Sequence, residues 1–263
     1  MVEPFHRLLT RLPRWERYKG FFQTATVRYL IVWFTIVPIV ATLLAGIPRP
    51  LPFERSGHPV SLDLDLPFSW EVLWLSSFFF FIGLVLYHLR CPAFVRRYNQ
   101  FSDYLACAHD AGWLCHEARA VVHDKALVGT FSERLLAKKY AHLLPPAAKW
   151  NETQNPTIEE KQTKLHFHRG NDKLVLAMPV LDAAGHVDPE AERGLFWEIF
   201  GLFSGSRPAS RAVVLVLLLA SLVCFMFVLL QHIAYGLTQT FEFFDFDTAA
   251  RYLQRLTGWL RMK

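Results

Sequence analysis

Residues 212–230 (AVVLVLLLASLVCFMFVLL) form a stretch of the sequence that contains no charged side chain. As a helix rising about 1.5 Å per residue, these nineteen positions extend ~30 Å, which matches the hydrocarbon core of a bilayer. Inside lipid every backbone N–H and C=O group must be paired within its own segment, so a run of this kind is expected to form a spanning helix. We therefore predict an integral membrane protein with a transmembrane helix at 212–237.

Two further runs, 29–47 and 72–89, also lack charged residues and are long enough to span a bilayer. The alternative is that each run forms a buried helix of a large soluble core. Aromatic residues near the ends of the runs favour the membrane, because their amphipathic rings prefer the level of the headgroups. The residues predicted to anchor the protein at the membrane interface are Trp15, Tyr29, Trp33, Trp70, Trp74, Tyr87 and Trp259.

The charged residues between these runs are distributed unevenly. Residues 1–28 carry six Lys and Arg against two acids, whereas the loop at 48–71 carries two against four. The segment 90–211 is nearly balanced, with sixteen against fourteen, and several of its arginines lie close to the predicted spans. Because Lys and Arg concentrate in cytosolic loops, we expect a multi-pass inner-membrane protein. Its N-terminus and residues 90–211 would be cytosolic, and its C-terminal tail would be outside.

Both ends of the chain are predicted to lie on the membrane surface, which makes membrane lipid an expected partner. Residues 1–28 interleave apolar residues with arginines, as in an amphipathic helix, although they fit equally well as the positive flank of the first span. Residues 238–263 are predicted to form an amphipathic interfacial tail. In the external loop at 48–71, residues 60–66 alternate like a single strand. A lone strand is unstable, so we expect it either to pair with another subunit, as in a homo-oligomer, or to lie against the membrane.

The cytosolic domain at 90–211 is predicted to be small and mostly helical. Apolar residues recur at spacings of three and four, which predicts helices over about 92–128 and 131–144, with possible breaks at Gly112 and Gly129. A further helix is expected at 189–203, because Asp188-Pro189-Glu190 is a typical helix start. Alternating residues on both sides of a polar turn predict a β-hairpin over about 164–180. The predicted fold is therefore mainly α, with three transmembrane helices and one hairpin.

Histidines provide the main candidates for a polar site. His109, His116 and His123 are seven residues apart, and neighbours on one helix would be separated by a rise of ~10.5 Å, too far to share one metal ion. With Arg119 they are predicted to form a polar stripe on the cytosolic helix.

Two other polar pairs stand out in the sequence. His166 and His168 would share one face of a strand and are weak metal candidates, because no third ligand stands at a suitable spacing. Gln231 and His232 form a candidate polar pair inside the membrane, where polar residues are often functional, although at the edge of a long span they fit equally well at the level of the headgroups. We therefore predict neither a metal nor another cofactor.

The sequence lacks recognisable catalytic motifs, including a phosphate-binding glycine loop and a nucleophile elbow. The near-balanced cytosolic charge also argues against direct nucleic-acid binding. We predict a non-enzymatic, self-associating protein that couples a cytosolic sensing or partner-binding domain to its spans. It would act as a channel-like or membrane-permeabilising effector, for example in stress or antiviral defence. The alternatives are a scaffolding or assembly subunit of a larger membrane complex and, third, a membrane-bound enzyme.

Overall fold

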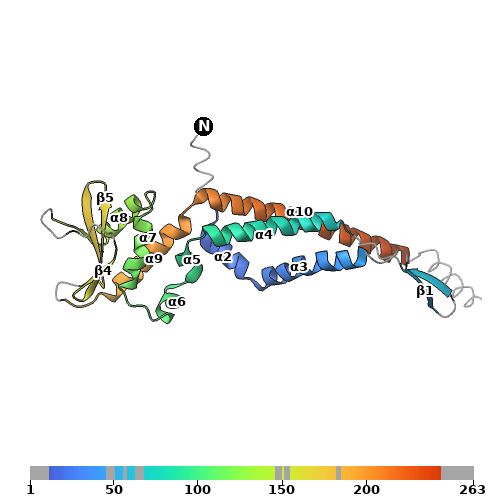
Figure 1. The fold of residues 1–263 in the computed structure, drawn as a ribbon, viewed down its shortest axis with the longest axis horizontal. Coiled ribbons are helices and arrows are strands. Elements are labelled where there is room, and N and C mark those ends of the chain that lie inside the picture. The colour runs from blue at the N-terminus through green and yellow to red at the C-terminus, as the bar shows by residue number, and fades with distance from the viewer. Residues whose placement is uncertain are drawn as a thin grey trace, which may run out of the picture. The chain divides into compact units, whose positions relative to one another are not determined.

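The chain is mainly helical and contains one small antiparallel sheet of four strands (Figure 1). The computed structural model describes residues 12–45, 51–55, 58–62, 68–145, 150, 155–181 and 185–243. Residues 244–263 of the tail predicted at 238–263, with Trp259, and most of the N-terminal arm lie outside these described residues.

The chain divides into two compact units. We call the first the sheet unit; it comprises Met1–Gln23 and Leu86–Ala212. We call the second the helical unit; it comprises Thr24–Val85 and Val213–Lys263. Two long helices, α4 and α10, contribute residues to both units, so the backbone passes between the units within continuous helices.

Two helices are long and apolar enough to cross a membrane. In the described part of the chain these are α4 (Trp70–Arg90) and α10 (Pro208–Phe243), whose apolar 18-residue windows have mean hydropathies of 2.0 and 3.3. A third candidate arises if the bent pair α2 (Trp15–Gln23) and α3 (Ala25–Ala45) is counted as one span. The three predicted apolar runs thus fall on α3, α4 and α10, and two or three of these segments are suited to a bilayer.

Helices α4 and α10 pack closely through small residues. The buried Ser76 hydroxyl donates to the Ser221 carbonyl oxygen at 2.8 Å. About two turns further along α4, Gly83 lies against α10, where an added Cβ would be 3.6 Å from atoms of Leu217 and Leu218. Small residues let helix backbones approach closely, and a hydroxyl in an apolar helix gains from an interhelical acceptor. Helices α4 and α10 are therefore in direct contact at these small residues.

Replacing Gly83 with leucine is expected to destabilise the helical unit by about 1–3 kcal/mol, because the new side chain would overpack the contact with α10. Alanine at Gly83 should be tolerated, since its Cβ would make ordinary van der Waals contact. Leucine at Gly236 is the matched control, because a Cβ there meets nothing within 4 Å. Thermal unfolding in nanodiscs measures the effect, and equal melting temperatures for the two leucine variants would contradict this packing.

The loop at 48–71 contains a hairpin rather than the single strand predicted at 60–66. Strand β1 (Leu51–Arg55) pairs antiparallel with β2 (His58–Leu62), with Leu51 opposite Leu62. The prediction was wrong because a proline-rich sequence conceals β1 from an alternation test. Since β2 has a strand partner within the chain, the argument for self-association from an unpaired strand no longer applies.

The sheet of the sheet unit has the strand order β3-β6-β5-β4. The predicted hairpin corresponds to β5 (Gln162–Arg169) and β6 (Asp172–Met178), and Gly170 in the turn has a positive φ of 59°. Two short edge strands, β3 (Ala141–Leu143) and β4 (Thr157–Glu159), widen this hairpin. One face is buried against helices, and its core side chains are Leu165, Phe167, Leu174, Leu176 and Met178.

The helical segment predicted over 92–128, with a possible break at Gly112, consists of three short helices. They are α5 (Ala93–Arg97), α6 (Phe101–Ala106) and α7 (Trp113–Val122). The Asp103 carboxylate accepts hydrogen bonds from the backbone N–H groups of Asn99 and Gln100, which starts a new helix at this point. Local capping bonds of this type compete with a continuous helix. The periodicity was correct, but the helix boundaries were not.

The remaining helices of the sheet unit lie near their predicted positions. Helix α8 (Val128–Ala137) ends earlier than predicted, because the chain turns at Lys139, which has a φ of 61°, and enters β3. Helix α9 (Pro189–Gly205) starts as predicted: the Asp188 side chain accepts a hydrogen bond from the Glu190 backbone N–H at 2.9 Å.

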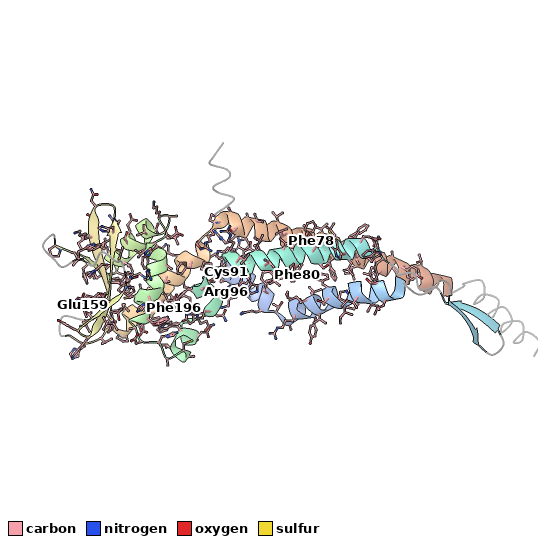
Figure 2. The ribbon with its side chains drawn as sticks, viewed as in Figure 1. Phe78, Phe80, Cys91, Arg96, Glu159 and Phe196 are labelled. Atoms are coloured by element: carbon pink, nitrogen blue, oxygen red, sulfur yellow. The ribbon has the colours of Figure 1, made fainter. Side chains whose placement is uncertain are left out.

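Aromatic side chains fill the core between these helices. The buried Phe196 of α9 has its ring 5.2 Å from that of Phe94, 5.8 Å from Tyr104 and 6.1 Å from Tyr98 (Figure 2). Tilted aromatic pairs at such distances add to the stabilisation from burial. Helix α9 is therefore fixed to α5 and α6, next to the sheet.

Candidate functional site

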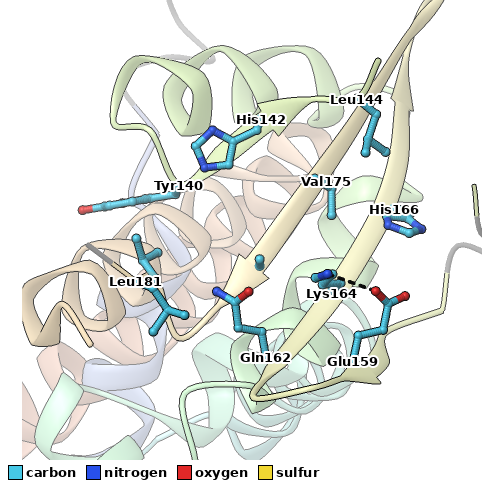
Figure 3. Close-up of a pocket in the computed structure, with 11 residues that line it drawn as sticks. Tyr140, His142, Leu144, Glu159, Gln162, Lys164, His166, Val175 and Leu181 are labelled. Carbon is cyan, nitrogen blue, oxygen red and sulfur yellow. Dashed lines mark hydrogen bonds and ion pairs between the residues drawn. The ribbon is translucent and has the colours of Figure 1, made fainter. Parts of the chain in front are cut away.

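The outer face of the sheet carries a cavity of about 650 Å³. This volume lies within the usual range for small-molecule sites. The cavity is enclosed by residues from β3 to β6 and by the segment after β6 (Figure 3). Its lining residues are Tyr140, His142, Leu144, Glu159, Gln162, Lys164, His166, Val175, Ala177, Val180 and Leu181.

The register of the strands explains why this face is hollow. The central strand β6 contributes only small side chains here, Val175 and Ala177. Larger polar residues stand on the neighbouring strands: His142 and His166 both pair with Val175, and Lys164 pairs with Ala177. Because residues directly opposite each other point to the same side of a sheet, polar side chains surround an apolar floor.

The polar side chains of the cavity largely compensate one another. Lys164 Nζ lies 3.0 Å from a carboxylate oxygen of Glu159, and the Gln162 amide donates to the Pro179 carbonyl oxygen at 2.8 Å. Burial lowers the pKa of His166, so its imidazole is neutral at pH 7. The site therefore offers hydrogen-bonding groups and an apolar floor without a strong net charge.

The two histidines proposed as weak metal candidates are covered by an indole ring. Trp150 stacks on His166 with a centroid distance of 5.5 Å, and it lies 4.4 Å from the ring of His168. Lys173 Nζ is 5.3 Å from the centroid of the Trp150 ring. Within the described part of the chain, no three His, Cys, Asp or Glu residues are grouped so that they could hold a metal ion. The geometry shows His166 and His168 as an aromatic stacking surface.

The predicted stripe of histidines is divided by the break before α7. His109 precedes that helix, and its ring stacks on Trp113 at 4.7 Å. His116 lies on the other side of the same indole, with centroids 5.5 Å apart. His123 is the C-terminal cap of α7, and its Nδ1 lies 2.8 Å from the carbonyl oxygen of Arg119. The structure thus groups His109 and His116 around Trp113 and separates them from His123.

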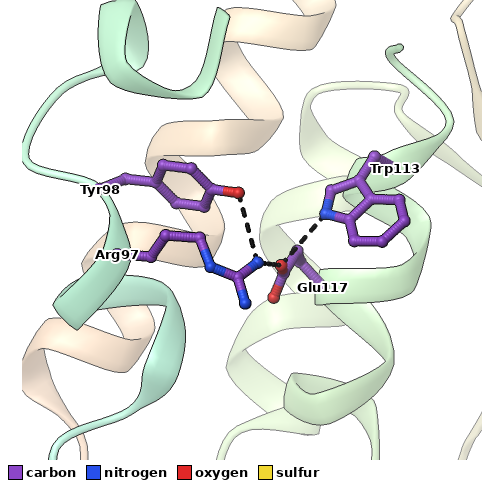
Figure 4. Close-up of polar contacts among 4 residues, drawn as sticks. All are labelled: Arg97, Tyr98, Trp113 and Glu117. Atoms are coloured by element: carbon purple, nitrogen blue, oxygen red, sulfur yellow. Dashed lines mark hydrogen bonds and ion pairs between the residues drawn. The ribbon is translucent and has the colours of Figure 1, made fainter. Parts of the chain in front are cut away.

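Trp113 is fixed by charged neighbours on the surface of the sheet unit (Figure 4). Its indole N–H donates to the Glu117 carboxylate at 3.2 Å, and Arg97 donates to the same oxygen at 3.2 Å. Arg97 also approaches the Tyr98 hydroxyl at 3.5 Å. These contacts link α5 with α7 at an exposed site, which is a structural role and needs no ligand.

Of the polar pair predicted to lie in the membrane, Gln231 has a structural partner. Its side-chain oxygen accepts a hydrogen bond from the Ser69 backbone N–H at 3.0 Å, directly before α4 begins. His232 is exposed, and its ring meets that of Phe68 edge to face at 6.2 Å. Gln231 therefore satisfies one of the unpaired N–H groups at a helix start, which is valuable in an apolar environment.

The predicted interface anchors fall into two groups. Tyr29, Trp33, Trp70 and Trp74 are exposed, as an interfacial position requires. Trp15 and Tyr87 are buried instead, with ring centroids 6.1 Å apart. These two side chains face protein, because they join α2 to the end of α4 inside the sheet unit. They are core residues and not lipid anchors.

In the sequence, Arg211 was counted only as a positive charge that sets topology. In the structure its side chain is buried and hydrogen-bonded to several backbone carbonyl groups. It donates hydrogen bonds to the carbonyl oxygens of Gly205 at 2.8 Å, Ser206 at 3.1 Å and Pro13 at 3.1 Å. Gly205 ends α9, and cations are favoured at the carbonyl end of a helix. Arg211 thereby joins the end of α9, the segment before α2 and the first turn of α10.

Other basic side chains bind the carbonyl ends of neighbouring helices. Arg96 donates to the His88 carbonyl oxygen at 2.6 Å, and Arg207 donates to that of Arg90 at 2.7 Å, both at the end of α4. The buried Lys19 of α2 donates to the Val95 carbonyl oxygen at 3.0 Å. We call Lys19, Arg96, Arg207 and Arg211 the basic joint. It fixes the ends of α4 and α10 that lie in the sheet unit.

Glu198 on α9 is expected to make the sheet unit sensitive to acid. Burial alone would raise its pKa, but hydrogen bonds from Lys138 and Arg134, at 2.6 and 3.0 Å, outweigh burial and leave the pKa below the ordinary value of 4.5. A carboxyl with a lowered folded-state pKa stabilises the fold above its unfolded pKa, and this contribution is lost as pH falls through the folded pKa. Glu198→Gln should therefore cost about 1–2 kcal/mol at pH 7 and nothing below the folded-state pKa.

Thermal unfolding of the full chain in nanodiscs, measured from pH 7 to pH 3, tests this expectation. The gap in melting temperature between Glu198→Gln and the unaltered protein should close as the pH falls through and below 4.5. Glu133→Gln is the matched control, because Glu133 is exposed on the neighbouring helix α8. A gap that persists unchanged in acid would show that Glu198 stabilises the fold without its charge.

No protein-family model matches the chain, and no curated protein and no solved structure matches it significantly. The function must therefore be inferred from the cavity, the basic joint and the apolar helices themselves.

Proposed function

We propose that the chain is a non-enzymatic inner-membrane protein that couples a cytosolic ligand- or partner-binding unit to its membrane spans. In this proposal α3, α4 and α10 cross the membrane, and the sheet unit lies in the cytosol. Binding at the cavity on the sheet changes how α4 and α10 are held, and the spans respond by permeabilising the membrane. Self-association of the spans would form the permeable state.

The observation that carries this proposal is the basic joint. Arg96 and Arg207 bind the end of α4, and Arg211 binds the end of α9 from the first turn of α10. Helix α9 also packs against α7, which contacts the sheet that forms the cavity. A shift of the sheet can thus reach the ends of α4 and α10 through packed elements, which is the physical requirement for coupling.

A second candidate function is a scaffolding or assembly subunit of a larger membrane complex. The edge strands of the sheet favour it, because Leu143 on β3 and Ile158 on β4 are 59% and 81% exposed. Exposed apolar side chains on a sheet edge are suited to binding another protein. In this case the spans would serve only as anchors.

Induced expression in bacterial cells separates the two functions. A permeabilising effector should cause propidium uptake and loss of membrane potential soon after induction. A scaffold should leave both signals at the level of the uninduced cells and should co-purify with partner proteins in fixed ratios. Fixed partners without any leak would contradict the effector proposal.

A further inference from the structure

The helical unit contains a second cavity of a different character. It has a volume of about 440 Å³ and lies between α3, the start of α4 and the second half of α10. Helix α3 contributes Trp33, Ile36 and Val40, and helix α10 contributes Phe225, Val228 and His232. Among the described lining residues, His232 is the one with a polar side chain.

The way α3 is held explains the cavity. The ring of Phe34 lies 5.7 Å from that of Phe80 on α4, which is labelled in Figure 2. It also lies 6.1 Å from the ring of Phe225 on α10. A smaller hollow of about 280 Å³ lies on the other side of this contact, between α3 and α4. Phe34 therefore acts as a spacer that keeps α3 in contact with its neighbours at one level and leaves apolar space beside it.

The polar end of the cavity coincides with the end of the apolar run. The run without charged residues extends to Leu230, and Gln231 and His232 follow directly. Phe225 and Val228 lie one to two turns before His232, inside the run. In a bilayer the cavity would thus have a polar group at the level of the headgroups and an apolar lining toward the interior.

We propose that this cavity binds one acyl chain of a membrane phospholipid, with the lipid headgroup beside His232. The inference rests on the membrane insertion of α3, α4 and α10 in the proposed function. An apolar void forfeits dispersion contacts along its whole lining, and lipid chains are the apolar molecules that surround a spanning helix. The bound chain would act as a wedge between α3 and the α4–α10 pair.

The test uses the full chain in phospholipid nanodiscs that contain a phospholipid with a photoreactive diazirine on its acyl chain. After illumination, mass spectrometry locates the labelled residues. Labelling should concentrate on Trp33 to Val40 and on Phe225 to His232. Val228→Trp should reduce it several-fold there, because Val228 is buried in the cavity wall. Val216→Trp is the matched control, because Val216 is 63% exposed on the same helix.

Val37→Trp fills the cavity from α3 and serves as a second variant if Val228→Trp does not fold. Labelling that is spread evenly over the exposed faces, or that is unchanged in both filled variants, would overturn the proposal. This outcome is distinct from failure of the proposed function. A protein that binds lipid at this site but never permeabilises cells would contradict the effector function and leave the lipid site in place. A protein that alkaline carbonate releases from membranes would contradict the membrane insertion on which both proposals rest.

Discussion

Replacing Ala177 with tryptophan is expected to abolish membrane permeabilisation by the induced protein, with propidium uptake reduced at least tenfold. Ala177 forms the floor of the cavity on the sheet, opposite Lys164. An indole there would occupy the space that a ligand or partner needs, without entering the core on the other face of the sheet. Propidium uptake and membrane potential are measured at matched expression levels.

The matched control is Ala120→Trp, which places the same side chain on the exposed surface of α7. It should permeabilise cells as well as the unaltered protein does. Both variants should unfold within a few degrees of the parent, which separates loss of binding from loss of folding. Full activity in a folded Ala177→Trp protein would show that the cavity has no part in the function.

Replacing Arg211 with alanine is expected to release the segment before α2 and to uncouple the sheet unit from α10. Arg211 is 5% exposed, and its loss leaves the carbonyl oxygens of Gly205 and Pro13 without their donor. Each unsatisfied buried group costs about 1–3 kcal/mol, so we expect a loss of about 3 kcal/mol in the free energy of unfolding. Hydrogen exchange should rise strongly over residues 12–19, and permeabilisation should be lost.

Two further variants make this result specific. Arg211→Lys should be intermediate, because an ammonium group lacks the planar fork with which arginine reaches several acceptors. Arg193→Ala removes an exposed arginine from α9 and should change neither exchange nor permeabilisation. Rapid exchange at residues 12–19 in the unaltered protein, equal to that of Arg211→Ala, would contradict the role of Arg211 in the joint.

The elements with strong local signals could be predicted from the sequence. The apolar run at 212–230 lies within α10, and the alternation around the turn at Gly170 corresponds to β5 and β6. The edge strands β3 and β4 could not be found in this way. Each has three residues, which is too short for an alternating pattern, and each forms only because the hairpin offers free hydrogen-bonding edges.

The break of the helix predicted over 92–128 shows a different limit. Periodicity is the same for one long helix and for consecutive short helices, so only local signals can mark the boundary. Gly112 was one such signal: it was noted as a possible break, and it directly precedes α7. The capping box of Gln100 and Asp103 before α6 was not noted, because the apolar pattern continued across it.

The candidate site was only partly visible in the sequence. His166 was noted for its spacing from His168. The cavity that His166 lines also includes His142, and the two histidines reach the same face of the sheet because both pair with Val175 of β6. The floor is formed by Val175 and Ala177, whose small size has no meaning until both neighbouring strands are in place. Arg211 was counted as a charge near a span, and one of its carbonyl partners, Pro13, lies almost two hundred positions away in the sequence.

Dye release from proteoliposomes tests most directly whether the sheet unit controls permeability. The purified full chain, with and without the small-molecule fraction of a cell extract, is compared with Ala177→Trp and Arg211→Ala. We expect release by the unaltered protein in at least one condition and by neither variant in that condition. Liposomes that stay sealed with the unaltered protein in both conditions, or that leak equally with all three proteins, would contradict it.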